Sequence, residues 1–149
     1  MAFRGQHEHS LDAKDRLTVP SKLRAQLADG VVLLAGLDPC VEIWPRDGYA
    51  SFTQRFLAGL NPLSSNARKI RRRFHAGAQD EELDSAGRVR LAKHLIAHAG
   101  LKGQCVVIGV EDHLEAWNPK RWTEHYAEID AQAVAMAEEL AGLDLDGSD

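Results

Sequence analysis

The sequence repeats itself, and this internal repeat constrains the fold more than any other feature. Leu11–Val19 aligns with Leu83–Leu91 at an offset of 72 residues, with Leu, Asp and Arg at the same spacing. Two later blocks follow in the same order, Val32–Ala35 with Val106–Gly109 and Val41–Pro45 with Leu114–Asn118. Each copy has about 40 residues, which is too few for a stable domain. We therefore expect the two copies to share one core, related by a pseudo-twofold axis.

Each copy has the pattern of a βαββ unit. A tight turn joins two strands in the first block of each copy, because Asp and Gly favour turns there. A short apolar-faced helix follows, at about residues 20–28 in the first copy and ending at Gly100 in the second. Two apolar strands come next, and we expect each pair to be antiparallel neighbours.

Helical patterns lie between the copies and after them. Apolar residues from Tyr49 to Leu60 keep three-to-four spacing, and Ser64 or Ser65 can cap a second helix. A narrow apolar stripe runs from Trp122 onward. The sequence thus predicts an α+β fold in four segments: a first repeat at 7–54, a helical insert at 55–80, a second repeat at 81–124, and a C-terminal helix with an acidic tail at 125–149.

The charge is unevenly distributed. The net charge is −4, but residues 1–110 hold 16 Lys and Arg against 11 Asp and Glu, and residues 111–149 hold 2 against 11. A basic body with an acidic tail is compatible with a polyanionic partner. No apolar run reaches the roughly 18 residues of a membrane span, and two cysteines do not make a disulfide scaffold. We expect a cytoplasmic protein with reduced thiols and no membrane partner.

The two Asp-x-x-x-Arg turns are the best candidates for a functional site. Asp12 and Asp84 can accept hydrogen bonds from backbone N–H groups two or three residues on and so structure the loops. Gly87 accepts a positive φ freely in the second turn. Arg16 and Arg88 would then project from rigid turns, where a guanidinium can bind phosphate or the O6/N7 edge of guanine. The alternative is an internal ion pair with the aspartate. Both roles can also hold in sequence, if the ion pair opens when DNA binds.

These motifs carry a family resemblance. Two Asp-x-x-x-Arg motifs, each followed by its two strands and a tryptophan, resemble the MraZ family of bacterial transcriptional regulators, which carry tandem SpoVT–AbrB-type domains. Phe3–Gly5 and Arg73–Ala78 are also similar, so the resemblance spans nearly the whole chain. The chain differs from the family pattern at Asp15, where Gly is usual, and at Ala92, where Pro is common.

The resemblance implies a fold and a function. It implies a barrel formed by the two βαββ repeats, and subunits assembled into a homo-oligomeric ring. It also implies binding to short direct repeats in the promoter of the protein's own operon, in the division and cell-wall gene cluster, with association with the nucleoid. We expect a sequence-specific DNA-binding repressor.

The resemblance further implies which residues contact double-stranded DNA. Arg16 and Arg88 are the principal candidates. Lys14, Arg4 and Arg90 lie near the turns in sequence, so phosphate contact is plausible for each, and an ordinary solvated surface is the alternative. The run Arg68–Arg73 can bind nucleic acid nonspecifically, be solvated, or pair with acids across a subunit contact.

Two other functions remain open from the sequence. An antitoxin-like interaction module would use the acidic 122–149 segment to bind a protein partner. A metal-dependent enzyme would use His94 and His98, whose spacing can bind zinc, but no carboxylate is placed to act as a base. Cys40 and Cys105 fit small core residues. We therefore expect no catalytic residues, no metal, no cofactor and no small-molecule substrate.

Overall fold

The chain forms two compact units. The computed structural model describes residues 2–147, with side chains up to residue 143. The first unit extends to Asn118 and holds all the strands, and the second begins at Pro119. Among the described residues, no helix is both long enough and apolar enough to cross a membrane.

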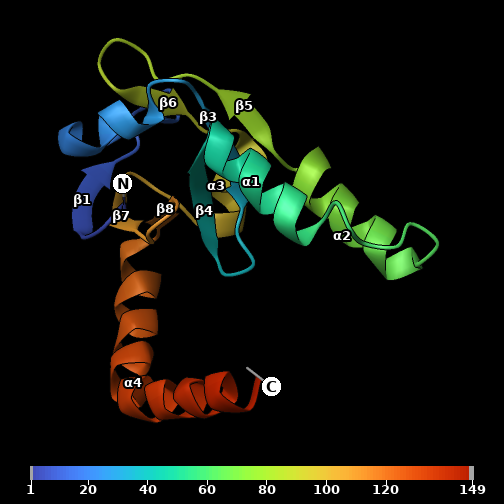
Figure 1. The fold of residues 1–149 in the computed structure, drawn as a ribbon. Coiled ribbons are helices and arrows are strands. Elements are labelled where there is room, and N and C mark those ends of the chain that lie inside the picture. The colour runs from blue at the N-terminus through green and yellow to red at the C-terminus, as the bar shows by residue number, and fades with distance from the viewer. Residues whose placement is uncertain (1, 148–149) are drawn as a thin grey trace. The chain divides into compact units, whose positions relative to one another are not determined.

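The order of elements follows the repeat (Figure 1). The first repeat contains β1 (Gln6–Ser10), β2 (Arg16–Thr18), the 3-10 helix η1 (Ser21–Leu27), β3 (Val31–Ala35) and β4 (Cys40–Pro45). The second contains β5 (Gln79–Glu81), β6 (Arg88–Arg90), α3 (Lys93–Ala99), β7 (Gln104–Gly109) and β8 (Leu114–Trp117). The remaining helices are α1 (Arg46–Phe56), α2 (Ser65–Ala76) and α4 (Pro119–Gly147). The predicted α+β fold, with helices between and after the repeats, is confirmed.

The helix of the first repeat is a 3-10 helix, whereas its counterpart α3 is an α-helix. In η1 the backbone bonds span three residues, with Leu23 N–H donating to Pro20 O and Ala28 N–H to Ala25 O. Helix α3 ends at Gly100, which has a left-handed conformation (φ 62°), as expected for a glycine that stops a helix.

The strands of the two repeats are interleaved in one antiparallel sheet. Its order is β1-β7-β8-β4-β3-β5, and β2 pairs with β6 in a separate two-stranded ribbon. The expected β3–β4 and β7–β8 pairs are present. The first strand of each repeat, however, pairs with the other repeat, β1 with β7 and β5 with β3. Exchanging the two repeats leaves this strand order unchanged. Closure into a barrel and a true pseudo-twofold axis stay predictions.

Both repeats contribute to one core. On one face of the sheet, side chains of both halves are buried together, including Leu17, Val89, Leu33 and Val107, each at most 1% exposed. This shared burial explains how two copies that are too small to fold alone form one unit. The opposite face carries a smaller cluster in which α1 and α2 cover Trp44.

Both tryptophans that follow the repeated strands are buried. Trp44 is 4% and Trp117 is 2% exposed, so both side chains are part of the core. Cys40 and Cys105 are free and buried, which confirms the prediction for both thiols. Helix α4 covers most of the predicted C-terminal segment, of which residues 148–149 lie outside the described part.

Candidate nucleic-acid interface

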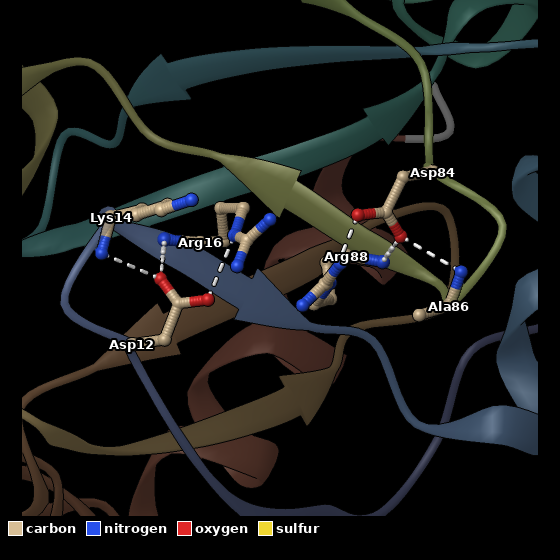
Figure 2. Close-up of polar contacts among 6 residues, drawn as sticks. All are labelled: Asp12, Lys14, Arg16, Asp84, Ala86 and Arg88. Carbon is tan, nitrogen blue, oxygen red and sulfur yellow. Dashed lines mark hydrogen bonds and ion pairs between the residues drawn. The ribbon is translucent and has the colours of Figure 1, made fainter.

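The first Asp-x-x-x-Arg turn is closed by its aspartate (Figure 2). Asp12 Oδ1 accepts from the backbone N–H groups of Lys14 (2.9 Å) and Arg16 (3.0 Å). Asp12 Oδ2 accepts from Arg16 Nε at 2.8 Å, which makes the ion pair. One carboxylate therefore holds both the backbone of the turn and the base of the guanidinium.

The second turn repeats the same contacts atom for atom. Asp84 Oδ1 accepts from the backbone N–H groups of Ala86 (2.9 Å) and Arg88 (2.8 Å). Asp84 Oδ2 accepts from Arg88 Nε at 2.9 Å. In both turns the aspartate N–H also donates to the carbonyl oxygen of its arginine, at 3.0 and 2.9 Å. The two turns are thus equivalent in geometry as well as in sequence.

These hydrogen bonds stabilise the charged form of both carboxylates. The pKa of Asp12 is lowered to about 2, chiefly by the backbone N–H of Arg16, with the Arg16 side chain and the Lys14 N–H also contributing. The pKa of Asp84 is lowered for the same reasons, with the backbone N–H of Arg88 as the main cause. Both aspartates are therefore ionised at neutral pH.

The β2–β6 ribbon brings the two arginines together. Arg16 pairs with Arg90, Leu17 with Val89 and Thr18 with Arg88. Because side chains alternate between the faces of a strand, Leu17 and Val89 point into the core and the three arginines share the other face. Figure 2 shows Arg16 and Arg88 between the two aspartates.

The two turns also brace each other. Val19 N–H donates to Gly87 O and Leu91 N–H donates to Asp15 O, both at 2.9 Å. Each strand of the ribbon is thereby extended onto the turn of the other repeat. These backbone bonds fix the two turns relative to each other, and the Nε contacts with the aspartates orient the guanidinium groups before any ligand binds.

The ion pairs leave the ends of both guanidinium groups available. Only Nε of Arg16 and of Arg88 donates to an aspartate, and the Nη groups donate no hydrogen bond to the described side chains or backbone of residues 2–143. The side chains are 26% and 35% exposed, respectively. The two alternatives for these arginines are therefore compatible, because an internal ion pair through Nε and a ligand contact through Nη can coexist.

The ribbon also places like charges opposite each other. Arg16 lies directly across from Arg90, and such cross-strand pairs of like charge are destabilising. Lys14 and Arg90 have exposed side chains, and no acidic group in the described part of the chain pairs with them. A bound anion would relieve the repulsion between these positive charges, so the surface is suited to binding one.

Arg24 is a further basic residue at this surface that the sequence did not indicate. Its Nε donates to Val19 O at 2.9 Å. Its guanidinium lies so close to Gly87 (φ 75°) that a Cβ there would overlap it. Its place on η1 depends on the 3-10 winding, for which the sequence carries no signal. Arg24 thus extends the basic surface over the second turn.

The first turn carries a different residue at the equivalent place. Asp15 has a positive φ of 61°, like Gly87, and its Oδ2 lies 3.6 Å from Nζ of Lys93. Asp15 tolerates this conformation at some cost, which glycine does not incur. The extra negative charge of the first turn is therefore balanced by a lysine of the second repeat.

Several basic candidates lie elsewhere. Arg4 is at the opposite end of β1 from the first turn, next to the Val110–Glu111 turn. The run Arg68–Arg73 lies on α2, which packs on the other face of the sheet from the core beneath the ribbon. Within it, Arg73 donates to the carbonyls of Ala35 and Gly36, both at 3.0 Å. The fold brings neither group to the β2–β6 ribbon.

The paired histidines do not converge on one point. His94 Nε2 contacts Gly77 O at 3.2 Å, and His98 Nε2 contacts Asp38 O at 3.0 Å. Each imidazole has its own backbone partner, so the helical spacing of these residues does not create a common ligand site.

Comparison with known proteins matches the chain along nearly its whole length. The model of the MraZ protein family, described as antitoxin-like, matches twice, at residues 2–73 and 74–144. A protein named "Transcriptional regulator MraZ" from Lactobacillus delbrueckii subsp. bulgaricus is 38% identical over 143 residues, covering 96% of this chain and 99% of the relative. Proteins of the same name from Limosilactobacillus fermentum (39%, covering 95% and 96%) and Symbiobacterium thermophilum (38%, covering 91% and 98%) are similar.

Proposed function

The chain belongs to the MraZ family, and we propose that it is a transcriptional regulator that binds specific double-stranded DNA through its β2–β6 ribbon. It acts as a homo-oligomeric ring, bound in the nucleoid to direct repeats in the promoter of its own operon in the division and cell-wall gene cluster, and represses that operon. The shared name of three relatives supports regulation of transcription.

The observation that carries this proposal is the pair of braced guanidinium groups. Arg16 and Arg88 are fixed at Nε by their aspartates and lie on one face of an antiparallel ribbon. The major groove of B-DNA admits a two-stranded β-ribbon, and an arginine can contact O6 and N7 of guanine with two N–H groups. Fixing the arginines beforehand reduces the entropy lost on binding.

The surrounding cations have a different role in this mechanism. Lys14, Arg24 and Arg90 lie beside the arginine pair and contact phosphates, which positions the ribbon without reading sequence. Arg4 is placed too far along β1 to join the same contact, so in this proposal it binds phosphate only where the DNA passes beyond the ribbon.

One ribbon offers few contacts, so the proposal requires several subunits. Subunits linked in a ring bind successive direct repeats with a high effective concentration after the first has bound. Repeats separated by about one helical turn, roughly 10 base pairs, would lie on the same side of the duplex.

The test compares Arg16→Ala, Arg88→Ala and the double variant with Arg72→Ala, which removes an exposed arginine from α2. Binding is measured by fluorescence anisotropy on DNA from upstream of the gene, and oligomer size by light scattering. We expect the double variant to lose its preference for this DNA with the oligomer intact, and Arg72→Ala to retain it. Unchanged affinity in the double variant would refute the proposal.

A second function is favoured by the description of the family as antitoxin-like. In that case α4 binds a protein partner through its acidic surface, since it has 2 basic residues, Lys120 and Arg121, both in its first turn. Co-purification of a toxin with the full-length protein, lost on truncation before Pro119, would support this function over DNA binding.

A further inference from the structure

A group of metal-binding side chains lies at the centre of the sheet, where the two repeats meet. Strand β4 of the first repeat pairs with β8 of the second, and Glu42 lies directly opposite Glu115. Cys40 is two residues before Glu42 and so shares its face of the sheet. The Cys40 sulfur and one carboxylate oxygen from each glutamate lie within 4.8 Å of one another.

This arrangement places several acidic groups in a poorly solvated position. Cys40 is fully buried, and Glu115 is 15% exposed. Directly opposed like charges destabilise a strand pair, and buried charges require compensation. A bound cation would compensate these opposed carboxylates.

The carboxylates are already oriented by neighbouring side chains. Trp44 Nε1 donates to Glu42 Oε1 at 2.9 Å, and Trp117 Nε1 donates to Glu115 Oε1 at 3.0 Å. His113 contacts Glu115 Oε2 through Nε2 at 3.0 Å and stacks on Trp44 with the ring centres 4.5 Å apart. Such outer contacts fix the direction of metal ligands in known sites.

We propose that Cys40, Glu42 and Glu115 bind one Zn²⁺ ion or a similar divalent transition-metal ion. His113 is a positioning residue, because it holds the carboxylate of Glu115 in place. Thiolate and carboxylate are zinc ligands at about 2.0–2.3 Å, so donor atoms around one tetrahedral ion lie about 3.3–3.8 Å apart, and the three side chains would close slightly around the ion. Three protein ligands leave a fourth position for water. On binding, the S–H bond of Cys40 is replaced by a sulfur–metal bond and the proton passes to solvent.

Gly36 lies directly against two of the proposed ligands. A Cβ at residue 36 would lie 2.7 Å from Cys40 Sγ and 3.2 Å from Glu42 Oε2. Gly36→Ala therefore crowds the proposed site without removing a ligand. The sequence predicted no metal because its ligands come from different repeats, 73 residues apart in the case of the two glutamates.

A bound ion would connect the two repeats at their central strand pair. Because the ligands come from β4 and β8, the ion binds the folded chain and not the unfolded one, so it should raise the melting temperature in a concentration-dependent way. This consequence is independent of DNA binding, and the two proposals can fail separately.

The test uses the full-length protein, stripped with a chelator and titrated with Zn²⁺ and with Co²⁺ as a spectroscopic probe. We expect one ion per chain, a thiolate-to-cobalt charge-transfer absorption and a higher melting temperature. Cys40→Ser and Glu42→Gln should lose these effects. Cys105→Ser is the matched control, because it removes the other buried thiol, and should retain them.

Two further variants separate ligands from neighbours. His113→Gln should weaken binding by about 10- to 100-fold while the cobalt absorption at saturation persists. Gly36→Ala should weaken binding with all ligands present. Far-UV circular dichroism establishes that each variant is folded. The proposal is overturned if the wild type binds no ion, or if Cys40→Ser and Cys105→Ser bind it equally.

Discussion

Replacing Arg16 by lysine tests whether the free end of its guanidinium reads DNA. In the structure Nε is occupied by Asp12 at 2.8 Å, so only a side chain with several fixed N–H groups can bind Asp12 and a base together. Lysine keeps the positive charge but has a single ammonium group without the fork geometry. Its ammonium group can pair with Asp12 and cannot also form the bidentate contact.

The size of the effect follows from that lost contact. A bidentate arginine–guanine pair discriminates against a wrong base by about 1–3 kcal/mol, which is about 5- to 150-fold in affinity. We expect Arg16→Lys to lose this factor on the specific DNA and little on scrambled DNA. Arg16→Ala should lose the same preference and, in addition, one phosphate-neutralising charge if Arg16 also approaches the backbone.

The assay is fluorescence anisotropy on specific and scrambled DNA across a salt series. The slope of log affinity against log salt reports the number of phosphates neutralised. Arg16→Lys should leave this slope unchanged, and Arg72→Lys on α2 should change neither the slope nor the preference. If Arg16→Lys binds the specific DNA as tightly as the wild type, the guanidinium ends do not read bases.

Three further predictions concern stability. Gly87→Ala should lower the free energy of unfolding by about 1–2 kcal/mol through the left-handed conformation alone, and it should also displace Arg24. The melting temperature should therefore fall, whereas Gly59→Ala, whose added Cβ would meet no atom within 4 Å, should leave it unchanged. Leu17→Ala removes a fully buried side chain beneath the ribbon and should cost about 2–5 kcal/mol in chemical denaturation. Hydrogen bonds lower the pKa of Asp12 from 3.8 to about 2, so the stability it contributes is present above pH 4 and lost as the pH falls through 2. Acid titration followed by circular dichroism should show a smaller loss of stability in Asp12→Asn than in the wild type, because the variant retains only the contribution of Asp84.

The repeat predicted much of the fold because it is carried by local patterns. Turn residues around Asp12 and Asp84 and the alternation in Val41–Trp44 are local signals, and the turns and the β3–β4 hairpin formed as expected. The exchange of β1 and β5 between repeats was not predicted. Alternation indicates which face of a strand is buried, but not which strand lies beside it.

The candidate site was predictable only in part, because local patterns do not show which distant residues lie side by side. Sequence spacing brings Asp12 to Arg16 within one turn, so the ion pair could be foreseen as an alternative. The pairing of Arg16 with Arg90 depends on a register between residues 74 positions apart. The position of Arg24 over Gly87 depends on the winding of η1. Arg4 is close to the first turn in sequence, but the length of β1 separates the two in space.

The most direct test of the account is the binding of the wild-type protein to DNA upstream of its own gene against a scrambled control, over a range of salt concentrations. The account predicts tighter binding to the native sequence, with log affinity falling linearly as log salt increases. Equal affinity for the two sequences at every salt concentration would contradict it, and the ribbon would then be a structural connection between the repeats.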